Sequence, residues 1–285
     1  MPVRLVAVLG HGVVDPQTPV ARADDAGLTR GDGCFEGIRI LTGPDGTARI
    51  SDLEAHLARM GRSAAALDIA FDAHTWGDFV TGAVANWHEP GETSLKLVLT
   101  RGGASGAPTG FLSISDLPAD YARQRREGLR VVTLTRGLTS DAFVGAPWLL
   151  GEVKTLSYAV HMAAQREAGR RGCDDVIFVS ADGMVLEAPT STVLWSVGRR
   201  LHTTPTGASG ILASTTQRLL FDRAAAEGWD CSSPPSTVDE LHAADSVWLT
   251  ASVRGPVDVV EIDGRSRERR PDVDAEIRRL AGFAI

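Results

Sequence analysis

Short segments with alternating or continuous apolar side chains recur along the whole sequence, and segments with helical periodicity separate them. A period of two is typical of strands, whereas apolar residues three and four apart are typical of helices. The predicted strands are residues 4–9, 34–41, 94–101, 111–115, 129–136, 175–180, 184–187, 192–197 and 247–251. The predicted helices are a segment from the capping-box pattern Ser51–Glu54 to Leu67, then 76–87, 156–168, a helix that follows Thr216 and runs to about Glu227, and a short C-terminal helix. The sequence therefore predicts a mixed α+β chain in two halves of about equal size.

A polar segment between the two halves contains Pro118 and is the best candidate for a linker. The chain has 285 residues, which is long enough for two modest domains. We expect an N-terminal α/β domain at 1–117, a linker at 118–128 and a C-terminal domain at 129–285.

Charge and cysteine content exclude several classes of protein. The 36 acidic residues outnumber the 29 lysines and arginines, giving a net charge of −7, which argues against nucleic-acid binding. No apolar stretch approaches the ~20 residues that a membrane helix needs. The three cysteines are far apart and form no pattern with zinc spacing, so we expect no metal site and a reducing, cytoplasmic location.

Lysine is rare in this sequence: only Lys96 and Lys154 occur among the 29 basic residues. Lys96 alternates with leucines, so it is expected on the solvent face of a strand. Lys154 precedes a predicted helix in an apolar context, where burial or a nearby cation would lower its pKa and permit a Schiff base. By spacing alone, a solvated lysine at a helix start is the favoured interpretation.

Two further features suggest a cofactor when they are taken together with Lys154. Glu187 ends a predicted strand, where its carboxylate could pair with a pyridinium nitrogen or be an ordinary strand-end glutamate. Thr215 and Thr216 precede a predicted helix, whose first amides and the two hydroxyls could bind a phosphate, although simple N-capping is the favoured interpretation of this segment alone. An amine, a carboxylate and a phosphate site are what pyridoxal phosphate requires.

Several motifs along nearly the whole chain occur in the order found in one enzyme family. They are RGDGCFEGIR (30–39), EAHLARM (54–60), LTRG (99–102), EVKTLSYA (152–159), DDVIFVSADGMVLEAPTSTV (174–193), GILASTTQ (210–217) and LTASVRGPV (249–257). With these motifs the chain resembles the class IV aminotransferases, the fold-type IV pyridoxal-phosphate enzymes. The resemblance implies two α/β domains joined by a short linker, a C-terminal pseudo-barrel and a homodimer.

The resemblance also assigns roles to particular residues. Lys154 would form the Schiff base and carry the proton between Cα and the C4′ atom of the cofactor, Glu187 would partner the pyridine nitrogen, and Arg59 of the H-x-x-R helix would bind the phosphate. The other implied cofactor-binding residues are Tyr158, Ser191, Thr192, Ile211, Leu212, Thr215 and Thr216. The implied substrate-binding residues are Phe35, Arg39, Arg101, Thr250 and Ala251.

The family contains more than one activity, and the motifs leave the choice open. The leading interpretation is an aminotransferase that moves an amino group between an amino acid or amine and a 2-keto acid. The alternative is an aminodeoxychorismate lyase, which forms 4-aminobenzoate and pyruvate in folate synthesis, and a further one is a non-catalytic protein that binds the cofactor. Ser157 replaces the asparagine of the lyases, Gln217 replaces an arginine of the phosphate loop, and residues 103–110 lack the charged carboxylate trap of the D-amino-acid enzymes.

Overall fold

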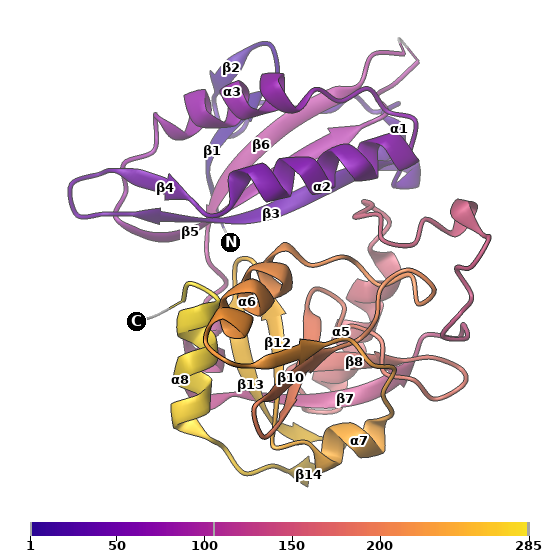
Figure 1. The fold of residues 1–285 in the computed structure, drawn as a ribbon. Coiled ribbons are helices and arrows are strands. Elements are labelled where there is room, and N and C mark those ends of the chain that lie inside the picture. Colours follow the sequence, from indigo (N-terminus) through magenta and orange to yellow (C-terminus); the bar gives the residue numbers. More distant parts are fainter. Residues whose placement is uncertain (1, 105, 284–285) are drawn as a thin grey trace. The chain divides into compact units, whose positions relative to one another are not determined.

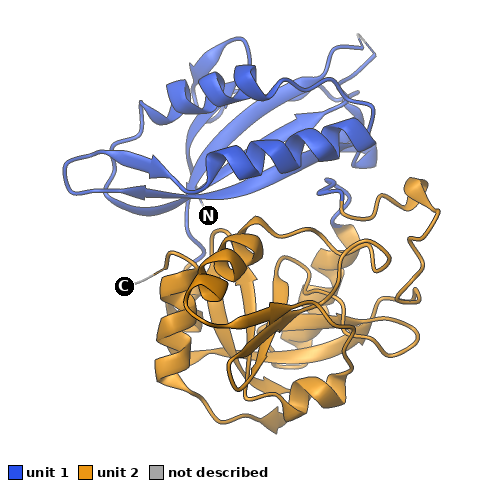
Figure 2. Ribbon diagram, viewed as in Figure 1, with its two compact units in different colours: residues 1–118, 153–158 blue, residues 119–152, 159–285 orange. Residues whose placement is uncertain are grey.

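The computed structural model describes residues 2–104 and 106–283, and it divides into two compact units (Figure 2). Unit 1 consists of residues 1–118 and 153–158, and unit 2 of residues 119–152 and 159–285. The prediction of a mixed α+β chain is confirmed. Among the residues described, no helix has the length and apolar character needed to cross a membrane.

Unit 1 is built on an antiparallel six-stranded sheet in the order β2-β1-β6-β5-β3-β4. Its strands are β1 (Val3–Val8), β2 (Gly12–Val14), β3 (Gly33–Thr42), β4 (Ala48–Ile50), β5 (Gly91–Thr100) and β6 (Thr109–Asp116), and its helices are α1 (Ala26–Arg30), α2 (Leu53–Ala66) and α3 (Ala73–Val84). Helices α2 and α3 cover one face of the sheet (Figure 1). Ile38 and Ile40 of β3 and Leu57 and Met60 of α2 are buried, as their spacing predicts.

The predicted capping box at the start of α2 is wrong. Helix α2 begins after Asp52, whose backbone is left-handed at φ 50° and whose side chain makes no capping hydrogen bond. The N–H of Ser51 donates instead to the carbonyl oxygen of Arg39 at 2.9 Å. Ser51 therefore extends the pairing with β3, and the chain turns into the helix one residue later.

The segment that contains Lys154 lies along the edge of β3 that the short strand β4 leaves uncovered. The N–H of Phe35 donates to the Lys154 carbonyl oxygen at 3.0 Å, and the N–H of Leu156 donates to the Gly33 oxygen at 2.8 Å. A Cβ atom on Gly33 would lie 2.5 Å from the Leu99 oxygen and 2.8 Å from the Leu156 side chain. The close approach of these two segments therefore requires a glycine in the RGDG motif.

Because residues 154–156 pair with the sheet, the predicted helix at 156–168 starts later than expected. Helix α5 spans Ala159–Arg170, so Lys154 is in an extended segment and not at the mouth of a helix. The apolar periodicity of this region is helical, but the Leu156 amide at its start is already bonded to the Gly33 oxygen of β3.

Unit 2 is built on an eight-stranded mixed sheet in the order β11-β10-β9-β12-β13-β7-β8, with β14 paired to β13. Its strands are β7 (Leu129–Thr135), β8 (Asp175–Val179), β9 (Thr192–Val197), β10 (Arg200–Thr203), β11 (Asp230–Ser232), β12 (Ser246–Ala251), β13 (Gly255–Ile262) and β14 (Arg265–Ser266). Its helices are α4 (Asp120–Glu127), η1 (Pro147–Leu149), α5, α6 (Thr215–Ala226), α7 (Val238–Ala243) and α8 (Pro271–Leu280). Helix α4 lies within the segment expected to be the linker.

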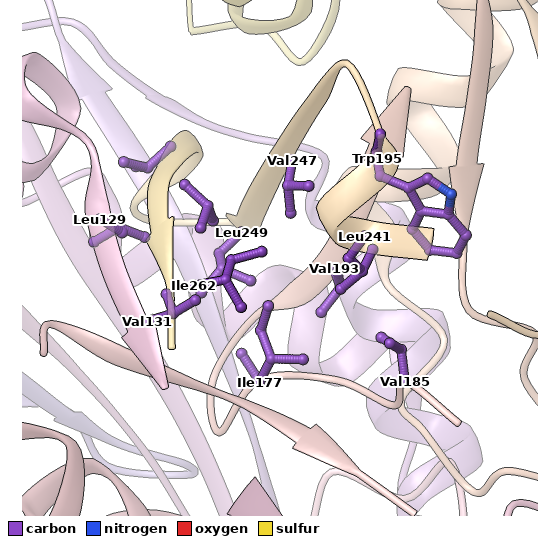
Figure 3. Close-up of a cluster of buried hydrophobic side chains, with 14 residues drawn as sticks. Leu129, Val131, Ile177, Val185, Val193, Trp195, Leu241, Val247, Leu249 and Ile262 are labelled. Carbon is purple, nitrogen blue, oxygen red and sulfur yellow. The ribbon is translucent and has the colours of Figure 1, made fainter. Parts of the chain in front are cut away.

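The sheet of unit 2 curves around one hydrophobic cluster. Side chains from strands that are far apart in the order of the sheet, β7 and β8 on one side and β9 and β12 on the other, meet in this cluster (Figure 3). They include Leu129, Val131, Ile177, Val193, Val247 and Leu249. This curvature is that of a half-barrel. On the opposite face Leu194 of β9 and Trp248 of β12 pack with Leu220 of α6. Side chains alternate along a strand, so Thr192 and Thr250 also lie on the face that α6 covers.

The predicted strand at 184–187 is an irregular segment that still pairs with β8. The N–H of Leu186 donates to the Phe178 oxygen at 2.8 Å, and the N–H of Phe178 donates to the Glu187 oxygen at 2.9 Å. Between these bonds, the N–H of Val185 donates to Ser236 at 2.7 Å. The backbone alternates between two partners, so no regular two-stranded ladder forms.

A buried pair of carboxylates in unit 2 should make stability depend on pH. Asp258 of β13 accepts a hydrogen bond from Arg269 Nε at 3.0 Å, and Asp274 of α8 accepts one from Trp248 Nε1 at 2.8 Å. Burial, together with the charge of Asp274, raises the pKa of Asp258 to about 6. Because this pKa is higher in the folded than in the unfolded state, stability is lost as the pH rises through about 4 to 6.

We therefore expect Asp258→Asn to raise the melting temperature by a few degrees at pH 8, where the wild-type carboxylate is charged. The gain should shrink at pH 4, where the folded protein already holds the proton. Thermal denaturation at both pH values measures this, and an equal difference at the two would refute the titration of Asp258.

Candidate active site

In unit 1, Lys154 is held at both its backbone and its side chain. Its N–H donates to Ser63 Oγ at 3.1 Å, and its Nζ lies 3.3 Å from the hydroxyl oxygen of Tyr158. The Nζ is also 4.4 Å from the ring centroid of Phe35, and the rings of Phe35 and Tyr158 meet edge to face at 5.1 Å. The side chain is half-buried, so the amine is in a fixed aromatic setting that remains accessible.

The second lysine is close to the same ring but in a different environment. Lys96 of β5 is exposed, as predicted. It pairs with Gly37 in the sheet, and its Nζ lies 5.7 Å from the Phe35 centroid. Unit 1 therefore places both lysines near Phe35, and Lys154 is the closer of the two.

Arg59 belongs to a buried polar cluster that the sequence interpretation did not find. Its Nε and Nη2 atoms each donate to Glu36 at 2.7 Å, and His56 Nδ1 lies 2.7 Å from the same carboxylate. Burial alone would raise the pKa of Glu36, but the hydrogen bonds and charges of Arg59 and His56 outweigh it and lower this pKa to about 2. An acidic residue in the apolar alternation of β3 was the signal that could have shown the cluster.

The two arginines expected to bind substrate both make hydrogen bonds within unit 1. Arg39 Nη1 donates to Glu92 at 3.0 Å. Arg101 donates to Asp32 through Nε at 2.6 Å and to the carbonyl oxygen of Leu67 through Nη2 at 2.6 Å. Arg101 thus ties the end of α2 to the RGDG loop, which is a structural role that the substrate assignment did not include.

In unit 2, Glu187 lies against the loop that leads into α6. Its Oε2 accepts a hydrogen bond from the N–H of Leu212 at 3.1 Å, and its side chain is half-buried. The neighbouring Ile211 is buried in a cluster with Leu186 and so anchors the loop. The orientation of the carboxylate is therefore set by the loop that precedes Thr215.

Thr215 and Thr216 are the first residues of α6, which therefore begins slightly earlier than the helix predicted to follow them, and both are buried. Ser214 caps the helix by accepting from the N–H of Gln217 at 3.2 Å. Thr216 Oγ1 lies 3.2 Å from Ser252 Oγ, which brings the helix start next to the end of β12. The first turn of a helix carries a partial positive charge, so this place suits an anion.

A buried hydroxyl at the end of β12 gives a test of whether a phosphate group fits. Thr250 is 1% exposed, and its Oγ1 has no hydrogen-bond partner within residues 2–104 and 106–283. It pairs with Thr192 and lies on the sheet face covered by α6. Because an unsatisfied buried hydroxyl is costly, a bound oxyanion beside it would account for its presence. Ala251, the last residue of β12, is half-buried.

A buried arginine that the sequence interpretation did not single out fixes the turn after β12. Arg254 Nη2 donates to Ser191 Oγ at 2.8 Å and pairs with Asp175 at 2.9 Å. Arg125 donates to the carbonyl oxygens of Val253 and Arg254 at 3.0 and 2.8 Å. Ser191, expected to bind cofactor, is thereby held by the same residue that orders the end of β12.

Comparison with known proteins agrees with the resemblance that the sequence motifs indicate. A family model described as amino-transferase class IV matches residues 33–262. A Mycobacterium tuberculosis protein named bifunctional aminodeoxychorismate lyase / D-amino acid transaminase is 38% identical over 285 residues, covering 96% of this chain and 97% of the relative.

Solved structures agree along the whole chain. A hypothetical aminotransferase from Mycobacterium tuberculosis, in a form with α-ketoglutarate and PMP bound, is 39% identical with a TM-score of 0.92 and covers 98% of both chains. The fold IV-transaminase CpuTA1 from Curtobacterium pusillum is 38% identical with a TM-score of 0.90 and covers 98% of this chain and 97% of that one.

Proposed function

The chain belongs to the class IV aminotransferase family, and from that premise we propose that it moves an amino group between an amino acid or amine and a 2-keto acid. Members of this family are pyridoxal-phosphate enzymes, and the predicted fold type IV is confirmed by the solved structures. The bound cofactor supplies an electron sink for the charge that develops at the substrate Cα. The observation that carries the proposal is the fixed, half-buried amine of Lys154.

We assign two tasks to Lys154. Its Nζ would hold the cofactor covalently, and once substrate displaces it the free amine would move the proton between Cα and C4′. Tyr158 lies 3.3 Å from the Nζ and the Phe35 ring 4.4 Å from it, which supports a defined direction for that transfer.

The remaining assignments concern binding. Glu187 would keep the pyridine nitrogen protonated, with its orientation set by the Leu212 amide. The start of α6 at Thr215 and Thr216, the Thr250 hydroxyl and Arg59 would hold the phosphate. Burial of these hydroxyls and of Arg59 supports the proposal, because buried polar groups need partners.

Aminodeoxychorismate lyase activity is the second candidate. The Mycobacterium tuberculosis relative carries both activities in its name. In the lyase reaction the amine stands on the ring of the substrate, and Lys154 would remove the proton from the carbon that bears it. The neighbouring ring carbon would then lose its enolpyruvyl oxygen, so that the ring becomes 4-aminobenzoate and the released group becomes pyruvate. One set of residues could therefore serve both reactions.

A donor screen distinguishes these activities. The purified holoenzyme is given D-alanine, L-leucine or (R)-1-phenylethylamine with a 2-keto acid, and separately aminodeoxychorismate alone. We expect amine transfer that depends on the keto acid. Release of 4-aminobenzoate without a keto acid would establish the lyase, and bound cofactor with no turnover of any donor would contradict both activities.

We also propose a homodimer in the cytoplasm. Trp148 and Val144 of unit 2 are 74% and 70% exposed, and large exposed apolar side chains in one segment are typical of a protein interface. The three cysteines are free thiols, which suits a reducing compartment. Light scattering should give twice the 30.2 kDa mass of one chain, and a monomer at micromolar concentration would refute the dimer.

A further inference from the structure

Glu36 is a carboxylate in the interior of unit 1, and its presence needs an explanation. It is fully buried on β3, between Cys34 and Ile38 on the strand face that α2 covers. Burying a charged group is costly unless it is paired and hydrogen-bonded. Glu36 meets this condition through α2, by the bonds to His56 and Arg59 described above.

The geometry of these bonds fixes the direction of the Arg59 guanidinium. Nε binds one oxygen of Glu36 and Nη2 binds the other, both at 2.7 Å, which is the bidentate arrangement that holds the guanidinium plane. His56 Nδ1 holds the carboxylate from a second side. These bonds fix the plane of the guanidinium and therefore also the direction in which its third nitrogen, Nη1, points.

The cluster is continuous with the surroundings of Lys154. His56, Arg59 and Ser63 follow one another at i, i+3 and i+7 on α2, so they form one buried polar stripe on that helix. Ser63 accepts the hydrogen bond from the Lys154 backbone. The Glu36–Arg59 pair therefore involves the same buried face of α2 as Ser63, which holds the backbone of Lys154. This shared position favours a role in the site over a role in stability alone.

We propose that Glu36 is a positioning residue for the cofactor phosphate, which it serves by orienting Arg59, and that His56 holds Glu36 in place. This inference rests on the proposed function, because it requires that Arg59 bind the phosphate of pyridoxal phosphate. Glu36 itself does not touch the cofactor. The carboxylate of Glu36 partly neutralises the charge of Arg59, so it does not increase the electrostatic attraction of the phosphate. Its contribution to phosphate binding is to fix the orientation of the Arg59 guanidinium.

The test compares two aldehydes that differ only in the phosphate. The Glu36→Gln variant keeps the shape of the side chain but can accept only one of the two Arg59 hydrogen bonds. Apoenzyme is titrated with pyridoxal phosphate and with pyridoxal, and absorbance reports the bound aldehyde. We expect the Kd for pyridoxal phosphate to rise about 10- to 100-fold, whereas the Kd for pyridoxal should change less than about threefold.

Control variants separate positioning from general loss of stability. Arg59→Lys keeps the charge without the fork and should show the same selective loss, and combining it with Glu36→Gln should add little, because the two residues act as one unit. Asp258→Asn removes another buried carboxylate paired with an arginine and should leave both affinities unchanged. If Glu36→Gln does not fold, His56→Asn, which removes one support of Glu36, takes the same test with a smaller expected loss.

Three results would overturn parts of the account, and they can be told apart. An equal loss of both aldehydes would show that Glu36 is structural only, and unchanged affinity for both would show that it does not position Arg59. If the wild-type protein binds pyridoxal phosphate no more tightly than pyridoxal, then Arg59 has no phosphate role and the positioning proposal fails with it. Failure of the wild type to bind either aldehyde covalently would instead refute the proposed function.

Discussion

Replacing Lys154 with alanine is expected to abolish amine transfer, lowering kcat/KM by at least about 10⁴-fold. The variant loses both the covalent attachment of the cofactor and the base that moves the proton at Cα. Steady-state kinetics with the best donor from the screen measure the loss. The absorbance of the bound cofactor should shift to that of the free aldehyde, because the amine that lies 4.4 Å from the Phe35 ring is lost and we do not expect the exposed Lys96 to replace it.

The chain provides a matched control for this prediction. Lys96 is the only other lysine, and its Nζ lies 5.7 Å from the same ring. Lys96→Ala should keep the covalent cofactor and retain activity within about tenfold of wild type. If activity survived in Lys154→Ala and disappeared in Lys96→Ala, the chemistry would belong to Lys96 and our assignment of it to Lys154 would be wrong.

Glu187→Gln is expected to lower kcat by about 10²- to 10³-fold, the range found when one preorganised electrostatic partner is removed. A neutral amide cannot keep the pyridine nitrogen protonated, so the ring accepts less charge from Cα. Glutamine can still accept the hydrogen bond from Leu212, so the loop should stay in place. Pre-steady-state rates of proton abstraction measure the effect, and cofactor affinity should change much less than the rate.

Glu152 serves as the control for Glu187. It also lies in unit 2 and accepts a loop N–H, that of Gly207, at 3.0 Å, but it is exposed. Glu152→Gln should therefore change kcat less than about twofold. A kcat within about threefold of wild type for Glu187→Gln would remove this residue from the chemistry.

Local sequence patterns predicted much of the fold, because strands and helices are set by side-chain periodicity over a few residues. β9 was predicted at its observed bounds, Thr192–Val197, and α6 was predicted to follow Thr216, although it already begins at Thr215. The features that the sequence did not predict depend on contacts between distant residues. The extended conformation at Lys154 follows from pairing with Phe35, which is more than a hundred residues away.

In the candidate site, too, local sequence features were predicted and features that depend on distant residues were not. Lys154 and Glu187 were singled out by their residue types, whereas Glu36 and Arg254 were not, because their importance comes from partners far along the chain. The capping-box pattern at Ser51 failed for a related reason, since a bond to β3 took its backbone amide. A sequence pattern therefore indicates which groups are present, but the tertiary bonds decide which of them are already engaged.

The central claim is that Lys154 carries the cofactor, and chemical trapping tests it most directly. The holoenzyme is reduced with borohydride, digested, and analysed by mass spectrometry for the phosphopyridoxyl group. We expect the group on the peptide that contains Lys154 and none on the peptide that contains Lys96. Label on Lys96, or a holoenzyme that borohydride leaves unlabelled, would contradict it.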